Sequence, residues 1–328
     1  MLNSTAQTTV CDIGGLPTRV LPVSAAIATR NRPAPLARML TSLATQSTQP
    51  TEIIIVDASD NEQTAMVCAN PPDQLASTIN YERAAERGAA TQRNQAVEKS
   101  SQSIVWFMDD DIVFEPECIA RLYAALVSDK HIGGASATII NQGYQQPGRV
   151  SCTLYRLLSG EGTTNWAGRV VGPAVNFLPE DNGALPEVVP VEWLNTTCTM
   201  YRREALPSPP FPDHFQGYSL MEDVALSLMI GRNWKLANAR TARIQHLSES
   251  GDHKSDPAAV AEMQLLNRHF VMKNILGRRR LRDYTGLLAF EAVSILSQLR
   301  SSKSRRQLLP ALRGRLRATR KLLFGIQY

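Results

Sequence analysis

The sequence predicts an α/β protein built on a mostly parallel sheet with helices on both faces. Short apolar segments alternate with segments of helical periodicity through the first 140 residues, as in repeated β-α units. Two of the apolar segments, residues 52–57 and 103–108, are rich in β-branched or aromatic side chains, which is typical of strands buried on both sides. A chain of 328 residues has room for one large domain with an appendage, or for two modest domains.

In the first half of the chain, each apolar run predicts a strand and each longer periodic segment predicts a helix. In open sheets of this type ligands bind at the carboxyl ends of the strands, so we expect the chemistry directly after them. The predicted strands are residues 23–28, 52–57, 77–81 (the weakest) and 103–108, and the predicted helices are residues 35–44, 88–99 and 116–127.

The second half of the chain begins with a change of character. Residues 141–192 contain many glycines and prolines and few periodic runs, which predicts irregular loops around a pocket. Regular structure resumes at residue 194. The predicted strands are residues 197–201, 234–237 and 242–245, and the predicted helices are residues 221–231, 257–276, 283–299 and 303–325.

The composition, with 43% hydrophobic and 20% charged residues, is that of an ordinary globular protein. The first twenty residues lack the basic start and apolar core of a signal peptide, and no segment approaches the roughly 20 apolar residues of a spanning helix. We therefore expect a soluble or peripheral protein of the cytoplasm. The five cysteines, at positions 11, 68, 118, 152 and 198, form no Cys-x-x-Cys pair. They therefore argue against a disulfide framework or a structural zinc site and fit a reducing compartment.

The net charge of +5 conceals an acidic body and a basic C-terminal tail. The chain carries +13 from Arg268 to its end and −8 before that residue. Apolar residues 287–296 lie between basic clusters at 278–282 and 300–306, an arrangement that suits the inner face of an anionic cell membrane. Packing of these helices on the body and formation of a homodimer are alternatives. We expect no nucleic-acid partner.

Three consecutive aspartates follow the predicted strand 103–108. Side chains alternate along an extended segment, so Asp109 and Asp111 can face the same way while Asp110 points elsewhere. Two convergent carboxylates at the mouth of a parallel sheet suit a hard divalent cation such as Mg²⁺ or Mn²⁺. Such a cation offsets the charge that grows on a departing diphosphate. An acidic surface loop is the alternative.

Four motifs in order resemble the family-2 glycosyltransferases with a GT-A fold. A first strand is followed by Thr-Arg-Asn-Arg at residues 29–32, and a second ends in Val-Asp at residues 56–57. Gly88 and Arg93-Asn94 match the family's Gly-x₄-Arg-Asn, and the Asp-x-Asp at residues 109–111 follows about fifteen residues later. Each motif is weak alone, but together they are specific, and the resemblance covers about residues 21 to 250.

The resemblance implies roles for the matching residues toward a nucleotide diphosphate sugar donor. Thr29 and Arg32 resemble positions that line the nucleotide pocket, and Asp57 resembles the acid that reads the base or ribose. Arg93 resembles the cation near the phosphates, and Asp109 belongs to both the donor site and the metal site. A turn-forming Asp57 and a solvated Arg93 are the structural alternatives.

The resemblance also extends to Glu222-Asp223 and to His246. Asp223 resembles the general base of inverting members, which takes the proton of the acceptor hydroxyl as that oxygen attacks the anomeric carbon. Ser219 and Glu222 have capping-box spacing, so Glu222 is assigned partly to a helix cap. His246 resembles a residue that contacts the metal or the diphosphate, and an imidazole favours Mn²⁺ over Mg²⁺.

We therefore predict an inverting, metal-dependent glycosyltransferase. Residues 20–250 are expected to form the GT-A domain, with 20–140 binding the nucleotide sugar and 141–250 holding the acceptor and the catalytic group; residues 257–328 form the basic helical extension. The expected acceptor is a glycan or lipid-linked glycan of cell-surface polysaccharide synthesis. The main alternative is a non-catalytic protein with a degenerate transferase body that binds membrane or nucleic acid through its tail. A nucleotidyltransferase is less favoured, because residues 25–33 contain no glycine for a phosphate loop.

Overall fold

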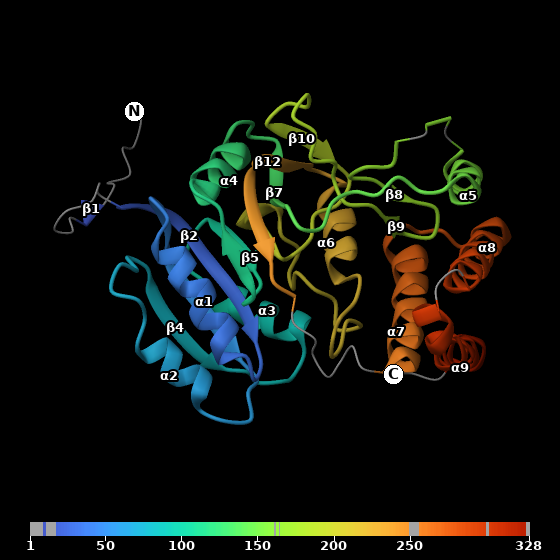
Figure 1. The fold of residues 1–328 in the computed structure, drawn as a ribbon, viewed down its shortest axis with the longest axis horizontal. Coiled ribbons are helices and arrows are strands. Elements are labelled where there is room, and N and C mark those ends of the chain that lie inside the picture. Colours follow the sequence, from blue (N-terminus) through green and yellow to red (C-terminus); the bar gives the residue numbers. More distant parts are fainter. Residues whose placement is uncertain are drawn as a thin grey trace.

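The computed structural model describes residues 9–10, 18–160, 162–163, 165–248, 256–299 and 302–325. One sheet with the strand order β10-β12-β7-β11-β5-β2-β3-β4 forms its centre, and β1 and β6 pair beside this path. Figure 1 shows the sheet with α1, α2 and α4 near it and the C-terminal helices gathered at the end away from the N-terminus. The strands of this sheet are β1 (Thr9–Val10), β2 (Thr18–Thr29), β3 (Thr48–Asp57), β4 (Thr78–Arg83), β5 (Ile104–Met108), β6 (Ile112–Phe114), β7 (Ile132–Ile139), β10 (Val188–Val191), β11 (Cys198–Arg202) and β12 (Lys235–His246).

The predicted α/β fold with a mostly parallel sheet is confirmed. β4, β3, β2 and β5 run parallel, and β12 runs parallel to β7. β11 lies antiparallel between β5 and β7, and β10 is an antiparallel edge strand on β12. The carboxyl ends of β2, β3 and β5 therefore meet at one edge, where ligands bind in sheets of this kind.

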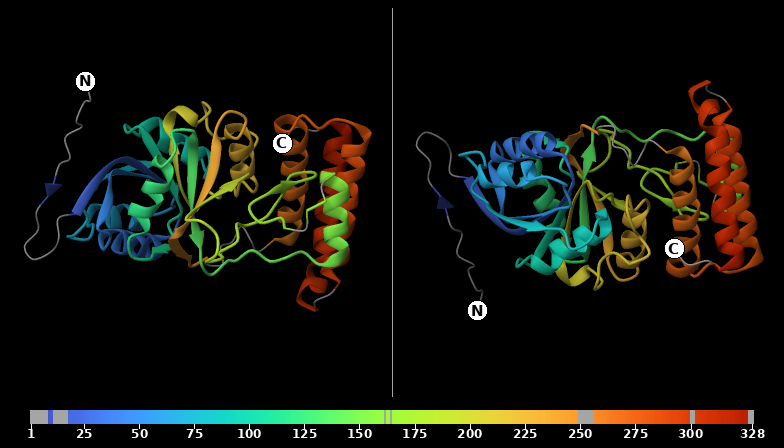
Figure 2. Two further views of the ribbon diagram at one scale, coloured as in Figure 1. Left: turned by 90° about the horizontal axis from the view of Figure 1, so that it is seen from above. Right: turned by 90° about the horizontal axis from the view of Figure 1, so that it is seen from below.

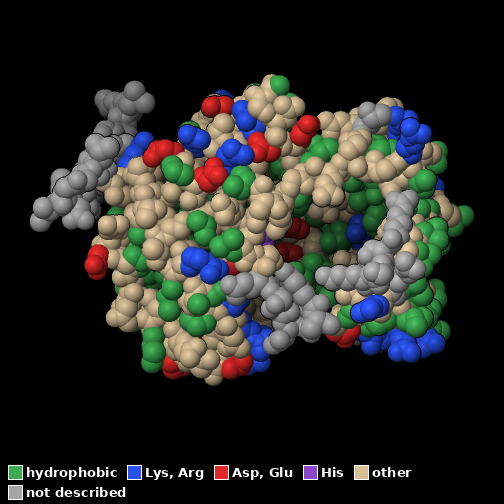
Figure 3. Space-filling model, in the orientation of Figure 1, with side chains coloured by type: hydrophobic (Ala, Val, Ile, Leu, Met, Phe, Trp, Pro, Cys, Tyr) green, Lys and Arg blue, Asp and Glu red, His purple; other side chains and the backbone are tan. Residues whose placement is uncertain are grey.

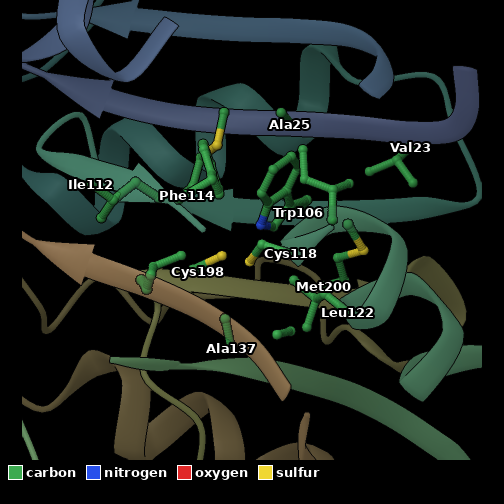
Figure 4. Packing of buried hydrophobic residues seen from close by; sticks show 14 of the residues in the cluster. Val23, Ala25, Trp106, Ile112, Phe114, Cys118, Leu122, Ala137, Cys198 and Met200 are labelled. Atoms are coloured by element: carbon green, nitrogen blue, oxygen red, sulfur yellow. The ribbon is translucent and has the colours of Figure 1, made fainter. Parts of the chain in front are cut away.

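Helices cover the two faces of the sheet and enclose separate cores. α1 and α4 pack on one face, where Trp106 of β5 lies among Phe114, Cys118 and Met200; the rings of Trp106 and Phe114 are 5.6 Å apart (Figure 4). α3 and α6 pack on the other face. The helices of the body are α1 (Pro33–Ala44), α2 (Gln63–Ala69), α3 (Ala89–Lys99), α4 (Cys118–Val127) and α6 (Glu222–Ile230).

The sequence did not predict strand β7, because its small side chains hide the strand pattern. Residues 132–139 read Ile-Gly-Gly-Ala-Ser-Ala-Thr-Ile and are buried throughout. A Cβ on Gly133 would lie 2.6 Å from the Cβ of Trp234, and one on Gly134 would lie 2.6 Å from the Tyr201 ring. The glycines leave room for these two aromatic side chains, so close packing against neighbouring segments explains the small residues of β7.

The prediction that residues 141–192 are irregular loops was wrong in part. This segment contains an amphipathic helix, α5 (Arg149–Ser159), a small hairpin of β8 (Val170–Val171) and β9 (Val175–Asn176), and the edge strand β10. α5 packs on α8, where the side chain of Leu158 meets Gly286. α5 is stabilised by contacts with a helix more than 120 residues away in the sequence, and local periodicity cannot predict such contacts.

The basic tail forms a helical bundle. Asp256 is the N-cap residue of α7 (Pro257–Phe270), and its carboxylate accepts a hydrogen bond from the backbone N–H of Ala258. The helix continues into a π-helical turn, η3 (Val271–Ile275). α8 (Leu281–Gln298) and α9 (Ser302–Phe324) complete the bundle, and α9 packs along α7. None of the described helices is both long enough and apolar enough to cross a membrane.

A buried ion pair and a close helix contact hold the bundle together. Glu291 of α8 accepts from Nε of Arg315 at 2.7 Å and lies 3.8 Å from Nε of Arg268. Arg268 also donates to the carbonyl oxygen of Ala174 at 2.8 Å, which ties the bundle to the β8–β9 hairpin region. Where α9 crosses α7, a Cβ on Gly314 would overlap the Ala258 carbonyl.

We predict that Gly314→Ala lowers the free energy of unfolding by about 1–3 kcal/mol, because the added methyl group forces α9 away from α7. Chemical denaturation of the full chain measures the change. Gly183→Ala is the control, since the structure has no atom within 4 Å of the added Cβ there. A Gly314→Ala protein as stable as the wild type would contradict the close contact between α7 and α9.

Candidate active site

The candidate active site lies where the carboxyl ends of the parallel strands meet the start of α6. The aspartates after β5 and His246 at the end of β12 lie on one side of it, and Glu222 and Asp223 lie in the first turn of α6. Figure 3 shows a hollow between the sheet and the C-terminal helices, with acidic side chains and a histidine on its wall. The site therefore opens toward the C-terminal bundle.

Asp109, Asp111 and His246 form a cluster of metal-ligating side chains. One ligand atom from each lies within 4.8 Å of the others. Nε2 of His246 is 3.1 Å from Oδ1 of Asp111 and 3.9 Å from Oδ2 of Asp109. Two carboxylates and an imidazole suit Mn²⁺ and, with lower preference, Mg²⁺. The donor set thus fits a divalent cation, as expected from the sequence.

Pairing of two strands far apart in the chain brings His246 to the aspartates. His246 of β12 lies opposite Ile112 of β6, and the backbone N–H of Leu247 donates to the carbonyl oxygen of Asp111 at 2.8 Å. Nδ1 of the His246 ring lies 3.2 Å from Nε2 of Gln142, on the side away from the aspartates. The ring is therefore held from both sides, with Nε2 facing the carboxylates.

Asp110 does not belong to this cluster of candidate metal ligands. Its buried carboxylate accepts from the Thr29 hydroxyl at 2.6 Å and from Nη1 of Arg32 at 2.8 Å. Nη2 of Arg32 contacts Asp111 at 2.6 Å. The first-loop residues Thr29 and Arg32 thus hold the aspartates directly, a contact that the sequence analysis did not foresee.

The electrostatic states of these aspartates differ. Burial raises the pKa of Asp110 to about 7, although Arg32 and the Thr29 hydroxyl oppose the shift. Burial would also raise the pKa of Asp111, but hydrogen bonds from His246 and Arg32 outweigh burial and hold it well below its usual range. Asp111 is therefore ionised at neutral pH, as a metal ligand must be.

Arg93 connects the aspartates to α6. Its buried guanidinium donates from Nη2 to Asp109 at 2.9 Å and from Nη1 to Glu222 at 3.0 Å. Burial alone would lower the pKa of Arg93, but the two carboxylates outweigh burial and raise it. The Arg93 guanidinium therefore stays charged at any physiological pH. Nε of Arg93 is buried and has no hydrogen-bond partner among the described residues.

Glu222 and Asp223 open α6, but the predicted capping box is not formed. The helix begins at Glu222, and its N-cap residue is Met221 in a left-handed conformation without a side-chain cap. The Ser219 hydroxyl donates instead to the carbonyl oxygen of Phe215 at 3.1 Å. The partial assignment of Glu222 to a cap was therefore wrong, because its carboxylate binds Arg93.

Asp223 is the freer of the two carboxylates. Its Oδ1 accepts from the backbone N–H of Val224 at 2.7 Å, and the backbone carbonyl oxygen of Asp223 accepts from the Ser227 hydroxyl. Burial raises the pKa of Asp223 above its ordinary value, while the Val224 N–H and Arg93 oppose the shift. Burial and the neighbouring Asp223 raise the pKa of Glu222 as well.

Asp57 lies at the end of β3 with both carboxylate oxygens engaged. Oδ1 accepts from the backbone N–H and from the hydroxyl of Ser59, and Oδ2 accepts from the Tyr81 hydroxyl at 2.9 Å and from Arg83 at 3.5 Å. The Asp57 side chain is buried, which places it under the loop after β3. The structure thus places Asp57 at the strand end next to β2 and makes it an anchor for this loop.

The sequence analysis assigned no role to three amides near the site. Nε2 of the buried Gln92 donates to the carbonyl oxygens that end β2 and β3, those of Thr29 and Val56, at 2.9 and 2.8 Å. Asn94 exchanges two hydrogen bonds with the backbone of Phe211. Gln95 binds the backbone of residues 83 and 85. Position inside the Gly-x₄-Arg-Asn motif was the available signal for Gln92 and Asn94.

A separate cavity of about 540 Å³ lies behind α6. Its lining includes Trp166, Arg169, Ser227 and Trp234, and none of the predicted site residues belongs to it. Arg169 on its rim is paired with Glu192 at 3.2 Å. The convergent acids and cations lie in the other hollow, which we take as the candidate active site.

Comparison with known proteins gives a family and a fold. The model of the family "Glycosyl transferase family 2" matches residues 24–206, which is more than half of the chain. No curated protein sequence matches the chain.

Solved structures with this arrangement are glycosyltransferases of low sequence identity. The mannosyltransferase PcManGT of Pyrobaculum calidifontis, in complex with GDP-Man and Mn²⁺, is 17% identical, with a TM-score of 0.53 over 93% of this chain and 88% of that one. S. aureus TarS 1–349 with UDP-GlcNAc is 17% identical, with a TM-score of 0.51 over 88% and 79%. GalNAc-T7 with UDP, GalNAc and Mn²⁺ is 15% identical, with a TM-score of 0.52 over 76% and 52%. These likenesses establish the GT-A fold.

We predict that Asp111→Asn weakens Mn²⁺ binding, because a charged ligand becomes neutral. Loss of a residue that only supports a metal ligand lowers the affinity by about 10–100-fold, and loss of the ligand's charge should lower it further. Titration calorimetry with Mn²⁺ measures the affinity. Asp73→Asn is the matched control on an exposed carboxylate. Unchanged Mn²⁺ affinity in Asp111→Asn would show that the cluster is not the metal site.

Proposed function

Because this chain belongs to glycosyl transferase family 2, we propose that it is an inverting transferase that moves a sugar from a nucleotide diphosphate onto a hydroxyl group. The observation that carries the proposal is that one arginine contacts both the candidate metal cluster and the acids at the start of α6. Arg93 contacts Asp109 of the candidate metal cluster and Glu222 beside Asp223. A donor-side charge site and an acceptor-side base therefore lie next to each other.

On the donor side, cations and candidate metal ligands surround the place for a diphosphate. Thr29 ends β2 and Arg32 is the N-cap residue of α1, and we assign both to the nucleotide-sugar pocket. Asp57, at the end of β3, would support this pocket by anchoring the loop after its strand. The charged guanidinium of Arg93, which contacts Asp109, would add positive charge beside the diphosphate. Asp109, Asp111 and His246 would hold Mn²⁺ or Mg²⁺, and the cation would supply positive charge to the leaving diphosphate. The imidazole favours Mn²⁺.

On the acceptor side, Asp223 is the proposed general base. A carboxylate there takes the proton of the acceptor hydroxyl while that oxygen forms its bond to the anomeric carbon and the bond to the diphosphate breaks. Attack opposite the leaving group needs one base and inverts the configuration. Glu222 accepts from Arg93 and so serves as a positioning residue for that cation.

We propose a lipid-linked or glycan acceptor in cell-surface polysaccharide synthesis, with the enzyme at the inner face of the cell membrane. The hollow of the site opens toward the helical bundle, whose sequence is strongly basic (Figure 3). A basic surface beside the site suits an acceptor held at an anionic membrane. The non-catalytic alternative would be favoured by loss of the site's acids, but all four carboxylates at positions 109, 111, 222 and 223 are present.

The test of the function is a panel of nucleotide sugars with Mn²⁺ or Mg²⁺, read out as nucleotide release. Release from one donor that depends on the cation and increases with added acceptor supports the proposal. No release from any UDP-, GDP- or dTDP-sugar, with membrane extract supplied as acceptor, would refute it.

We predict that Asp223→Asn keeps the donor affinity of the wild type and lowers the rate of sugar transfer by about 10²–10⁴-fold, because the amide cannot accept the hydroxyl proton. Donor affinity is measured by calorimetry and transfer by product formation. Asp73→Asn again controls for the loss of one carboxylate. Transfer at the wild-type rate would exclude Asp223 as the base.

We also predict a pH dependence that reports this base. Asp223 acts only when deprotonated, so kcat/KM falls as the pH drops through its pKa. Burial raises that pKa, so the fall should occur well above the about 3.9 of an ordinary aspartate. The fall should persist in Glu222→Gln if Asp223 is the titrating group. A profile that stays flat down to pH about 4 would contradict the assignment.

A further inference from the structure

Exposed large apolar side chains are concentrated at one end of the molecule. Among the described residues, ten of the twelve with high exposure lie on α5, on α9, or on α8 and its C-cap residue. Figure 2 shows these three helices side by side at the end opposite the N-terminus. Scattered exposed leucines need no explanation, but a contiguous set marks an interaction surface. The ten are Val150, Leu157, Leu281, Leu288, Leu296, Leu299, Leu309, Leu316, Leu323 and Phe324.

On α9, leucine and arginine alternate along a single outer row. Leu309, Arg313, Leu316, Arg320 and Leu323 are spaced by four and three residues in turn, which places them on one side of a helix, and all five are exposed. The opposite side is buried, at positions 311, 314, 315 and 318, against the rest of the bundle. The row therefore faces outward, because the opposite side of α9 packs against the rest of the bundle.

On α8, the outer row carries no charge. Leu281, Leu288, Ala292 and Leu296 follow one another at helical spacing and are exposed, whereas Gly286 and Leu287 on the other side are buried. α5 lies beside it and adds Val150 and Leu157. We call the exposed rows of α5, α8 and α9 the terminal face.

The charge of the terminal face is of one sign. α9 contains no acidic residue in the 23 residues from Ser302 to Phe324, and α5 contains none either. Of the two acids of α8, Glu291 is paired with Arg315 inside the bundle at 2.7 Å, and Asp283 accepts from the backbone N–H of Arg280 at 2.8 Å and lies 3.8 Å from Nε of Arg282. Arg313 and Arg320 of the outer row have no acidic counterpart among the described residues, whereas the exposed Arg317 is paired with Glu262 of α7 at 2.8 Å.

These features distinguish between two occupants. A second copy of the chain docked by this face would bring the arginine rows of two α9 helices toward each other, and like charges repel. A bilayer with anionic headgroups accepts both components, because leucines enter the acyl boundary while arginines remain with the phosphates. Charge complementarity therefore favours an anionic lipid surface.

We propose that the terminal face docks on the surface of an anionic phospholipid bilayer, with the exposed rows of α8 and α9 lying in the headgroup region. The inference extends the proposed membrane location by assigning the contact to particular side chains, and it rests on residues outside the transfer site. The helices lie on the surface and do not cross it, in agreement with the absence of a spanning helix among those described.

Deletion of the tail would not test this inference, because the same helices complete a core. Leu287 and Ala318 are buried with Leu265, Leu266 and Met272 of α7 and η3. Substitutions confined to exposed positions avoid this difficulty. We therefore compare Leu309→Gln/Leu316→Gln with Arg313→Glu/Arg320→Glu, each in the full chain, and confirm the fold of each by circular dichroism.

The measurement is flotation with vesicles of equal parts phosphatidylglycerol and phosphatidylcholine, and with vesicles of phosphatidylcholine alone. The wild type should bind the anionic vesicles, and both double variants should bind at least about tenfold more weakly, because each loses two contacts with the interface. Met66→Gln/Val127→Gln and Arg19→Glu/Lys130→Glu are the matched controls on exposed residues elsewhere, and they should bind as the wild type does.

Three results would overturn the inference. The wild type fails to bind phosphatidylglycerol vesicles, or both terminal-face variants bind them as tightly as the wild type. Alternatively, light scattering shows a wild-type dimer without lipid that the Leu309→Gln/Leu316→Gln variant converts to a monomer, which would make the face a self-association surface. Donor-dependent nucleotide release is measured in the same samples. Release without vesicle binding rejects only the membrane inference, and binding without release rejects only the transferase proposal.

Discussion

A buried guanidinium holds the two halves of the candidate active site together. Without Arg93, Asp109 and Glu222 would face each other across a largely dehydrated space, and their like charges would drive them apart or force a proton onto one of them. The position of Arg93 depends in turn on α3, which Gln92 fastens to the carbonyl oxygens at the ends of β2 and β3. One turn of a helix thus fixes both the sheet edge and the acids of α6.

The same principle, alternation of buried opposite charges, organises the rest of the site. Arg32 bridges Asp110 and Asp111, and Thr29 closes the contact from β2. Breaking a buried pair of this kind is costly because it leaves an uncompensated charge. A diphosphate donor with its cation brings both signs of charge, so the site can exchange these internal contacts for contacts with substrate without a net imbalance. We regard this balance as the physical basis of the proposed donor binding.

The helical bundle uses charge in a different way on its two sides. Inside, Arg268 and Arg315 share Glu291 as their acidic partner, and small residues let α9 approach α7. Outside, the arginines of α9 alternate with exposed leucines. A single basic sequence therefore serves both packing on the body and, in our proposal, contact with lipid, which the sequence analysis had treated as alternatives.

Periodicity and strand-ending polar residues are local properties, so the sequence alone predicted the α/β class, six of the twelve described strands, and the positions of the acids and cations. It failed for α5 and β7, whose support comes from distant packing. Only the tertiary structure decided the partners: Arg93 reaches Glu222 across 129 positions, and His246 meets Asp111 through the pairing of β12 with β6. It also decided which leucines of α8 and α9 are inside. A pattern reports that a side chain is apolar or charged, whereas its neighbour and its exposure depend on segments far away in the chain.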